Sequence, residues 1–181
     1  NWAAILTSAQ CRAMASETAD GAIKSFCLDD SINGRVWVLY EGHNDECPGD
    51  SNTIQAFYSD DYGASWTKVT RITAGWASER TAHRVQASGN TVFASYNSGS
   101  EFAIFYSTDK GASWSSGGAP WDSGVIVLNP LQPDRVYYSS FSYGGGFRVM
   151  TSSGTVTNLN GATINSMWFS TVSANHHRNV Y

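Results

Sequence analysis

Two ten-residue stretches of this chain are nearly identical in sequence. One reads FYSDDYGASW and begins at Phe57, and the other reads FYSTDKGASW and begins at Phe105. A local sequence that occurs twice predicts a local structure that occurs twice, so this repeat limits the possible folds more than any other feature. The residues that define the shared pattern S-x-D-x-G-x-S-W are Ser59, Asp61, Gly63 and Trp66 in the first copy and Ser107, Asp109, Gly111 and Trp114 in the second.

Each copy has the composition of a tight turn between two strands. The aspartate can accept hydrogen bonds from backbone N–H groups, the glycine can adopt a positive φ, and the serine hydroxyls can close the loop. The segments TIQAFYS and FAIFYS precede the two turns and predict strands. We therefore expect two β-hairpins, in which the tryptophan after each turn fills a gap between packed sheets.

The pattern resembles the Asp-box, or BNR repeat, of sialidases, xyloglucan-degrading glycosidases, sortilin-type receptors and certain lectins. In those families the box joins the two outer strands of a propeller blade and has a structural role rather than a catalytic one. The resemblance implies an all-β fold, a β-propeller of four-stranded antiparallel blades. The interval of 48 residues between Ser59 and Ser107 is the size of one such blade.

Other segments fit the same spacing. Pairs of short apolar segments joined by polar turns begin at Ala22, Ala82 and Gly124 and predict the inner strands of three blades. A third outer hairpin keeps a partial trace of the box in Thr151, Ser153 and Gly154. The chain then forms a single propeller portion with these parts: a partial blade at 1–20, blades at 21–72, 80–118 and 122–160, and a partial blade at 161–181.

The first and last segments predict an incomplete ring of blades. NWAAIL at the start is similar to the end of a box, and the segment from Ile164 onward repeats the opening of a blade. A stack of blades that does not close leaves sheet edges and apolar faces exposed. We therefore expect an internal part of a longer protein. The alternatives are a ring completed by a second copy and a shorter fold that reuses the hairpin.

Composition excludes several classes of function. Only 14% of the residues are charged, the net charge is -4, and Lys and Arg form no cluster, so nucleic acid is not an expected partner. No apolar segment approaches the roughly 20 residues of a membrane helix, and no signal segment opens the chain. Aromatic residues reach 13%, which is typical of a β-rich protein.

The chain has three cysteines. Cys11 and Cys47 fall in loops on the same face of the predicted propeller, so a Cys11–Cys47 disulfide is one expectation. Three unpaired cysteines are the alternative. Cys27 falls on an inner strand and is expected to be a buried free thiol. A disulfide would indicate a secreted protein or one in the secretory pathway.

The predicted topology gathers several loops on the face opposite to the boxes, where we expect the ligand. Sugar rings stack on aromatic side chains, and sugar hydroxyls bind Asp, Glu and Arg. The candidate ligand-binding residues on this face are His43, Trp76, Arg80, Trp121, Tyr143 and Arg148. Packing between blades for both tryptophans, and a surface ion pair of Arg80 with Glu79, are the alternatives.

Glu41, Asp45 and Glu79 are the candidate catalytic residues, because a glycoside hydrolase needs two carboxyl groups on opposite sides of a cleft. No cofactor and no metal are expected for this chemistry. The acidic loop with Asp45, Glu46 and Asp50 could bind Ca²⁺, although its spacing does not match an EF-hand. A solvated acidic loop is the alternative.

Two functions fit these features. The first is a secreted glycoside hydrolase of the sialidase or xyloglucanase type that acts on glycans. A sialidase would also need an arginine cluster, and no motif assigns Arg80, Arg84 or Arg148 to one. The alternative is a propeller that binds a glycan or a peptide without turnover, such as a lectin or a sortilin-type receptor. We favour the carbohydrate-active protein, on an argument from fold alone.

Overall fold

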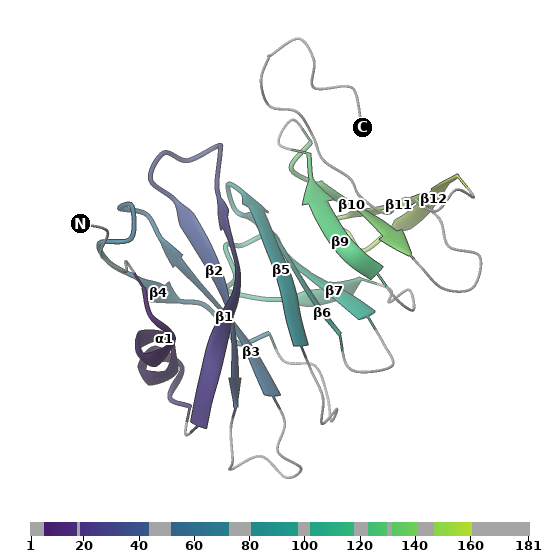
Figure 1. The fold of residues 1–181 in the computed structure, drawn as a ribbon. Coiled ribbons are helices and arrows are strands. Elements are labelled where there is room, and N and C mark those ends of the chain that lie inside the picture. Colours follow the sequence, from purple (N-terminus) through teal and green to yellow (C-terminus); the bar gives the residue numbers. More distant parts are fainter. Residues whose placement is uncertain are drawn as a thin grey trace.

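Three four-stranded antiparallel sheets and one short helix make up the part of the chain that the structure describes (Figure 1). The structure is a computed structural model, and its described residues are 6–17, 19–43, 52–72, 81–97, 102–117, 123–129, 132–140 and 147–160. The helix is α1 (Ser8–Ala15). The strands are β1 (Ala19–Leu28), β2 (Val36–His43), β3 (Asn52–Ser59), β4 (Thr67–Lys68), β5 (Thr81–Ser88), β6 (Thr91–Asn97), β7 (Phe102–Ser107), β8 (Ser115–Gly117), β9 (Ser123–Leu128), β10 (Arg135–Ser140), β11 (Phe147–Thr151) and β12 (Val156–Asn160).

Each sheet is built from four strands that follow one another in the sequence. The sheets have the strand orders β1-β2-β3-β4, β5-β6-β7-β8 and β12-β11-β10-β9. The first strands of the sheets lie in front in Figure 1, where β5 contacts both β1 and β9, and the sheets fan out behind them. This is the arrangement of blades in a β-propeller and confirms the predicted fold class. We call the three sheets blade 1, blade 2 and blade 3.

Two apolar cores lie between the blades. Successive residues of a strand point to opposite faces of its sheet, so Trp37 and Leu39 of β2 both face blade 2, where they join Val85 and Phe105. The core between blades 2 and 3 contains Phe93, Phe102, Ile104, Ile126, Leu128, Val136, Tyr138 and Met150. Blade 2 is therefore covered on both faces.

Helix α1, which is not predicted from the sequence, covers part of the outer face of blade 1. The helix begins with a capping box, in which Gln10 N donates to Thr7 Oγ1 (3.2 Å) and Thr7 N donates to Gln10 Oε1 (2.8 Å). It ends at Ser16, which has a positive φ of 60°. Its buried residues pack against Tyr40 and Phe57 of blade 1. The segment between the first residues and β1 is thus a docked helix rather than a loop.

The predicted Cys11–Cys47 disulfide is wrong, because Cys11 is a free thiol. It lies on α1 and is fully buried in the packing between the helix and blade 1, and burial raises the pKa of this thiol to about 11. Cys27 lies on the inner strand β1 and is also a free thiol, as predicted, but its residue is partly exposed and not fully buried. Burial raises its pKa to about 12. Neither thiol is therefore a nucleophile at neutral pH. Cys47 lies outside the described residues.

The repeated sequence forms the same turn twice, in what we call the repeat hairpins (residues 59–66 and 107–114). In the first, Asp61 Oδ1 accepts hydrogen bonds from Ser65 N (2.8 Å) and Ser59 Oγ (2.7 Å), while Ser59 Oγ accepts one from Gly63 N (2.7 Å). The corresponding bonds of the second hairpin have lengths of 2.9, 2.7 and 2.7 Å. Gly63 and Gly111 both have a positive φ, 88° and 78°.

The third outer hairpin is shorter than the repeat hairpins. The closing pair of residues is Met150 with Val156, whereas Tyr58 with Thr67 closes the first repeat hairpin. The hydroxyls of Thr151 and Ser153 are 2.7 Å apart, and Gly154 has a φ of 81°. A hydroxyl pair and a glycine thus remain from the repeated pattern, as the sequence predicts.

The second repeat hairpin also joins blade 2 to blade 1. Thr70, just after β4, donates from its N to Gly111 O (3.0 Å) and from its Oγ1 to Ala112 O (2.7 Å). Its own carbonyl accepts a hydrogen bond from Trp114 Nε1 (2.9 Å). Trp114 therefore packs and bonds between two sheets, as predicted. Trp66, after the first repeat hairpin, packs instead in the cluster between α1 and blade 1.

Arg35, in the turn between β1 and β2, makes a second joint between these blades. Its Nη1 donates to Gly89 O of blade 2 (2.9 Å), and its Nη2 donates to Asp60 Oδ2 (3.2 Å). The Asp60 carboxylate also accepts a hydrogen bond from Lys110 Nζ of blade 2 (2.7 Å). Asp29 completes the joint by accepting a bond from Gly89 N (2.9 Å). Carboxylates and cations from two blades therefore neutralise one another at this joint.

Candidate functional site

The described turns lie at one end of the blades, which we call the turn end. It contains the turns 29–35 and 89–90, the described residues 129 and 132–134 between β9 and β10, and the outer hairpin turns 60–66, 108–114 and 152–155. Within a blade, a backbone hydrogen bond joins the inner turn to the outer hairpin turn. Tyr62 N donates to Gly34 O in blade 1 (2.9 Å), and Lys110 N donates to Asn90 O in blade 2 (2.9 Å). The first strand of each blade begins at the opposite end, which we call the loop end, where the sequence predicts the ligand.

Most of the predicted site residues lie outside the described residues. They are Asp45, Glu46, Asp50, Trp76, Glu79, Arg80, Trp121 and Tyr143. His43 is the last residue of β2, and its side chain also lies outside the described part. Glu41 and Arg148 are the two predicted residues whose side chains are described.

Glu41 lies near the loop end of β2 and bridges blades 1 and 2. Its Oε2 accepts a hydrogen bond from the backbone N of Ala82, the second residue of β5 (2.7 Å). Its Oε1 lies 3.2 Å from Lys24 Nζ on β1, and the Glu41 side chain is only 14% exposed. Both oxygens of this carboxylate are therefore held in place by the protein.

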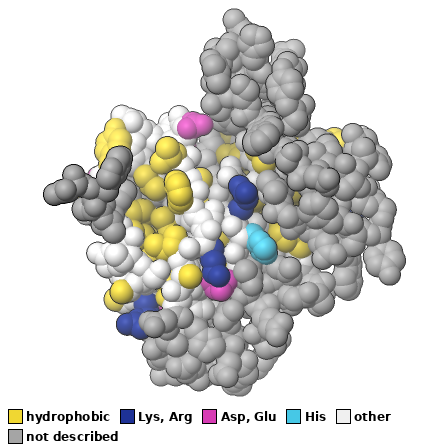
Figure 2. All heavy atoms as spheres, viewed as in Figure 1, with side chains coloured by type: hydrophobic (Ala, Val, Ile, Leu, Met, Phe, Trp, Pro, Cys, Tyr) yellow, Lys and Arg dark blue, Asp and Glu magenta, His cyan; other side chains and the backbone are white. Residues whose placement is uncertain are grey.

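Lys24 of β1 forms an ion pair with Glu41, and His83 of β5 is within electrostatic reach of Glu41, Lys24 and Arg84. The His83 ring also packs toward Phe102, with 6.2 Å between the ring centroids. Burial lowers the pKa of His83, the nearby charges of Lys24 and Arg84 lower it further, and Glu41 opposes the shift. Figure 2 shows basic, acidic and histidine side chains close together over the inner strands. We call Lys24, Glu41, His83 and Arg84 the inner-strand cluster.

The inner-strand cluster offers contacts of the kind that a polar ligand needs. The ammonium and guanidinium groups donate hydrogen bonds, the carboxylate accepts them, and a neutral imidazole does both. The cluster holds one carboxylate, whereas glycoside hydrolysis requires two. On its own it is therefore suited to binding sugar hydroxyls, and catalysis would need a second carboxyl group.

Arg148 lies on β11 opposite Tyr138 of β10 and faces the core between blades 2 and 3. The Arg148 side chain is partly buried, and no hydrogen-bond partner of its Nε lies within the described part of the chain. Burial raises the pKa of Tyr138, and the Arg148 charge opposes that shift. Arg148 therefore packs beside an inner aromatic residue rather than standing free at the loop end.

Sequence reasoning missed Lys24 and His83 as neighbours of Glu41. Both occupy strands next to irregular register, with a bulge between Ile23 and Ser25 and another between Ala82 and Arg84. A bulge changes the direction of the side chains that follow it, so simple alternation does not place them.

A buried carboxylate that the sequence analysis also missed holds α1 to blade 1. Glu17 Oε1 accepts hydrogen bonds from Thr53 Oγ1 (2.7 Å) and Arg71 Nη2 (2.7 Å). Its other oxygen is buried and has no partner among the described residues. Thr53 and Arg71 lie 36 and 54 residues from Glu17 in the sequence, which explains why no local pattern reveals these contacts.

The described residues contain no group of three or more His, Cys, Asp or Glu side chains that could hold a metal ion. The proposed Ca²⁺ ligands Asp45, Glu46 and Asp50 lie outside them. No helix in the described part of the chain is long and apolar enough to cross a membrane.

The chain is similar in structure to several solved proteins. The GH74 enzyme of Niastella koreensis superposes with a TM-score of 0.54 and 22% sequence identity, over 84% of this chain and 20% of that one. The GH93 α-L-arabinofuranosidase of Fusarium graminearum, solved with arabinobiose, gives a TM-score of 0.45 and 15% identity over 76% and 48%. A family 117 glycoside hydrolase of Zobellia galactanivorans superposes with a TM-score of 0.45 and 12% sequence identity, over 80% of this chain and 47% of that one.

Of these likenesses, the one to the GH74 enzyme supports the fold. The likeness to the GH74 enzyme agrees with three propeller blades, and the chain spans about a fifth of the length of that enzyme. No protein-family model matches the chain. No curated protein matches it either.

Proposed function

We propose that this chain belongs to a carbohydrate-active propeller, a secreted glycoside hydrolase of the sialidase or xyloglucanase type that acts on glycans. The observation that carries the proposal is the blade fold shared with a GH74 enzyme. The Asp-box resemblance of the repeat hairpins, whose aspartates are fully engaged in their own turns, supports the same class. The catalytic groups must then lie away from the hairpins, at the loop end.

In this proposal Glu41, Asp45 and Glu79 are the candidate carboxyl groups. Glu41 is described, and its orientation is held by Ala82 N and Lys24 Nζ. A carboxylate fixed in this way is suited to orient a sugar or to act as nucleophile or base, while the acid would come from another residue. The ligand contacts proposed for the loop end as a whole are His43, Trp76, Arg80, Trp121, Tyr143 and Arg148.

A binding propeller without enzymatic activity is the second candidate function. The observation that favours it is that both oxygens of Glu41 already make contacts between strands. The inner-strand cluster would then bind a glycan or a peptide through Lys24, His83 and Arg84, without a reaction.

The test combines a binding screen with a hydrolysis screen on the same panel of xyloglucan, arabinan and sialylated oligosaccharides. Glu41→Gln keeps an oxygen for Ala82 N but removes the charge that pairs with Lys24. For an enzyme, we expect Glu41→Gln or Glu79→Gln to lower kcat/KM by roughly 100-fold or more. The matched control is Asp134→Asn, an exposed carboxylate at the turn end.

Each outcome separates the two candidates. Hydrolysis that the site variants abolish and the control keeps supports the glycoside hydrolase. Binding that depends on the inner-strand cluster, with no product formed by the unmodified chain, supports the binding propeller. Neither binding nor hydrolysis of any glycan in the panel contradicts a carbohydrate-active function.

A further inference from the structure

Each blade has a pair of residues that face each other across its second and third strands at the same register. The pairs are Val38 with Phe57, Ala94 with Phe105, and Tyr138 with Arg148. The inner strands fix this alignment, because the first member of each pair also pairs with an apolar residue that follows the irregular register, Phe26, Val85 or Ile126. Blades 1 and 2 therefore hold an apolar pair where blade 3 holds a tyrosine and an arginine.

Arg148 stands where the other two blades have a buried phenylalanine. Phe57 and Phe105 are 0% and 7% exposed. Residues directly opposite each other on paired strands point to the same face of the sheet, so Arg148 faces the core between blades 2 and 3 together with Tyr138. The neighbours in this core are apolar and include Phe93, Phe102, Ile104 and Ile126. A charged side chain in such a place needs a partner.

The tyrosine and the arginine both present hydrogen-bond donors that have no acceptor among the described residues. Tyr138 is 0% exposed, and its hydroxyl has no hydrogen-bond partner in the described part of the chain. The same is true of the buried Nε of Arg148. Burial raises the pKa of Tyr138, and the Arg148 charge opposes that shift, so the phenol keeps its proton at neutral pH and can donate it.

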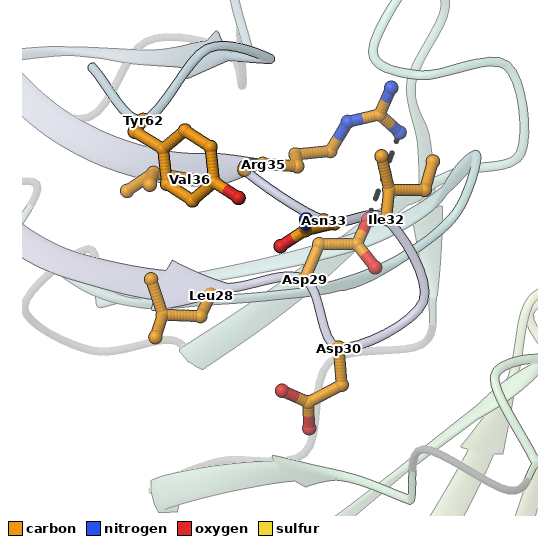
Figure 3. A pocket seen from close by; sticks show the side chains of 9 residues that line it. Leu28, Asp29, Asp30, Ile32, Asn33, Arg35, Val36 and Tyr62 are labelled. Atoms are coloured by element: carbon orange, nitrogen blue, oxygen red, sulfur yellow. Dashed lines mark ion pairs between the residues drawn. The ribbon is translucent and has the colours of Figure 1, made fainter.

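Arg35 shows how the chain satisfies a buried arginine elsewhere. Its side chain is 6% exposed, and its Nη1 lies 3.7 Å from Asp29 Oδ2, in the ion pair that is dashed in Figure 3. Asp60 supplies a second carboxylate, and Gly89 O accepts a hydrogen bond from Nη1. The joint between blades 1 and 2 thus surrounds its arginine with acceptors and negative charge.

Arg148 has no such surroundings within the described residues. The described carboxylates of blades 2 and 3 are Asp109 and Asp134. Asp109 is engaged in its own hairpin, and Asp134 pairs with Arg135. Both lie at the turn end, whereas Arg148 is the second residue of β11 and lies near the loop end. Within the described part of the chain, nothing therefore supplies a counter-charge to Arg148.

The arrangement around Arg148 leaves one direction of access. On the turn-end side, Met150 faces the same core and lies so close to Gly117 of β8 that a side chain on this glycine would clash with it. On the loop-end side, Arg148 is partly exposed. A small solute would therefore reach the two donors from the loop end.

We propose that Arg148 and Tyr138 bind a small inorganic anion, such as chloride, at the loop end of the core between blades 2 and 3. The Nε–H and the hydroxyl donate to the anion, and its charge neutralises the guanidinium, which a bound water would not do. The anion, rather than a sugar, then takes the Nε–H of Arg148. This inference is independent of whether the chain acts on glycans.

The test is thermal unfolding of the full chain at constant ionic strength, while sodium chloride replaces sodium gluconate, whose anion is much larger. If the dissociation constant is about 10 mM, roughly 100 mM chloride should raise the ratio of folded to unfolded chain about tenfold. The linewidth of the chlorine NMR signal gives a direct second readout, because chloride that exchanges with a site on the protein relaxes faster. We expect the protein to broaden this signal.

Two variants locate the site. Arg148→Met removes the cation and keeps the length of the side chain, so it should abolish the chloride effect and the broadening. In gluconate it should be at least as stable as the unmodified chain, because an apolar side chain replaces a cation without a partner. Tyr138→Phe removes only the hydroxyl and should raise the dissociation constant roughly threefold to tenfold. It keeps the test decisive if Arg148→Met fails to fold.

The matched control is Arg135→Met, which removes an exposed arginine of the same blade and should keep the full chloride effect. Equal stability in chloride and gluconate, without broadening, would overturn the proposal. Destabilisation by Glu101→Gln or Asp122→Asn would then assign the counter-charge to carboxylates of the chain that lie outside the described residues. A chloride effect that persists in Arg148→Met would also overturn it, since this would indicate a general effect of salt on the protein surface.

Discussion

At the scale of single residues, the two aspartates of the repeat hairpins hold their turns as anions. The pKa of Asp61 is lowered to about 2, first by the hydroxyl of Ser65 and then by its backbone N–H. Ser113 lowers the pKa of Asp109 to about 2 in the same way. A sequence pattern predicted this role correctly because every partner lies within four residues of the aspartate.

The hairpin aspartates predict a dependence of stability on acid pH. Their folded-state pKa lies below the usual 3.8, so their contribution is complete above about pH 4 and is lost as the pH falls toward 2. The double variant Asp61→Asn, Asp109→Asn should lose stability at neutral pH and show a flatter decline between pH 4 and 2. Thermal unfolding at several pH values measures both effects. A decline as steep as that of the unmodified chain would show that other groups cause it.

Glu17 shows the opposite case, a residue whose role depends on distant partners. Glu17→Ala removes the acceptor of Thr53 and Arg71 in a buried place. We expect this substitution to lower the free energy of unfolding by about 2–3 kcal/mol. This is less than the loss of a fully buried ion pair would cost, because Arg71 is partly exposed. Urea denaturation measures the change. Asp134→Ala, which breaks an exposed pair, is the control and should change stability by less than about 1 kcal/mol; equal effects would contradict the structural role of Glu17.

At the scale of elements, the strands and repeat hairpins were predictable because alternation and turn chemistry are local signals. Helix α1 was not predicted, although Thr7 and Gln10 form a capping box. The helix has eight residues, which is too short for a periodic apolar pattern to stand out. It is stabilised instead by packing on blade 1, and that contact cannot be seen in the local sequence.

Two hairpin glycines should differ in their tolerance of a side chain. Both Gly111 and Gly154 have a positive φ. A Cβ on Gly111 would lie 2.8 Å from Val69 Cβ of blade 1, whereas on Gly154 it would meet Tyr106 Oη at 3.1 Å. Gly154→Ala should cost about 1 kcal/mol, from backbone strain and a small shift of the Tyr106 side chain, and Gly111→Ala about 1–3 kcal/mol more because blade 1 must shift. Chemical denaturation compares them, and equal costs would show that the second repeat hairpin is not docked against blade 1.

At the scale of the whole molecule, the 48-residue interval predicted the order of the blades but not how they are joined. The contacts of Arg35 with Asp60 and Gly89 connect positions 25 and 54 residues apart, and no periodic pattern specifies such pairs. The ligand site was predictable only in part, because its residues come from connections between strands. Among the predicted site residues, Glu41 is the one that lies in a described cluster of polar side chains.

The central claim is that three consecutive blades stack in sequence order through their hairpins. Nuclear Overhauser measurements on methyl-labelled protein test it most directly. We expect cross-peaks between the Val69 methyls and Gly111, and between the Met150 methyl and Gly117, because these groups are in contact across the two blade interfaces. Cross-peaks within the hairpins without either of these two would contradict the stacking of the blades.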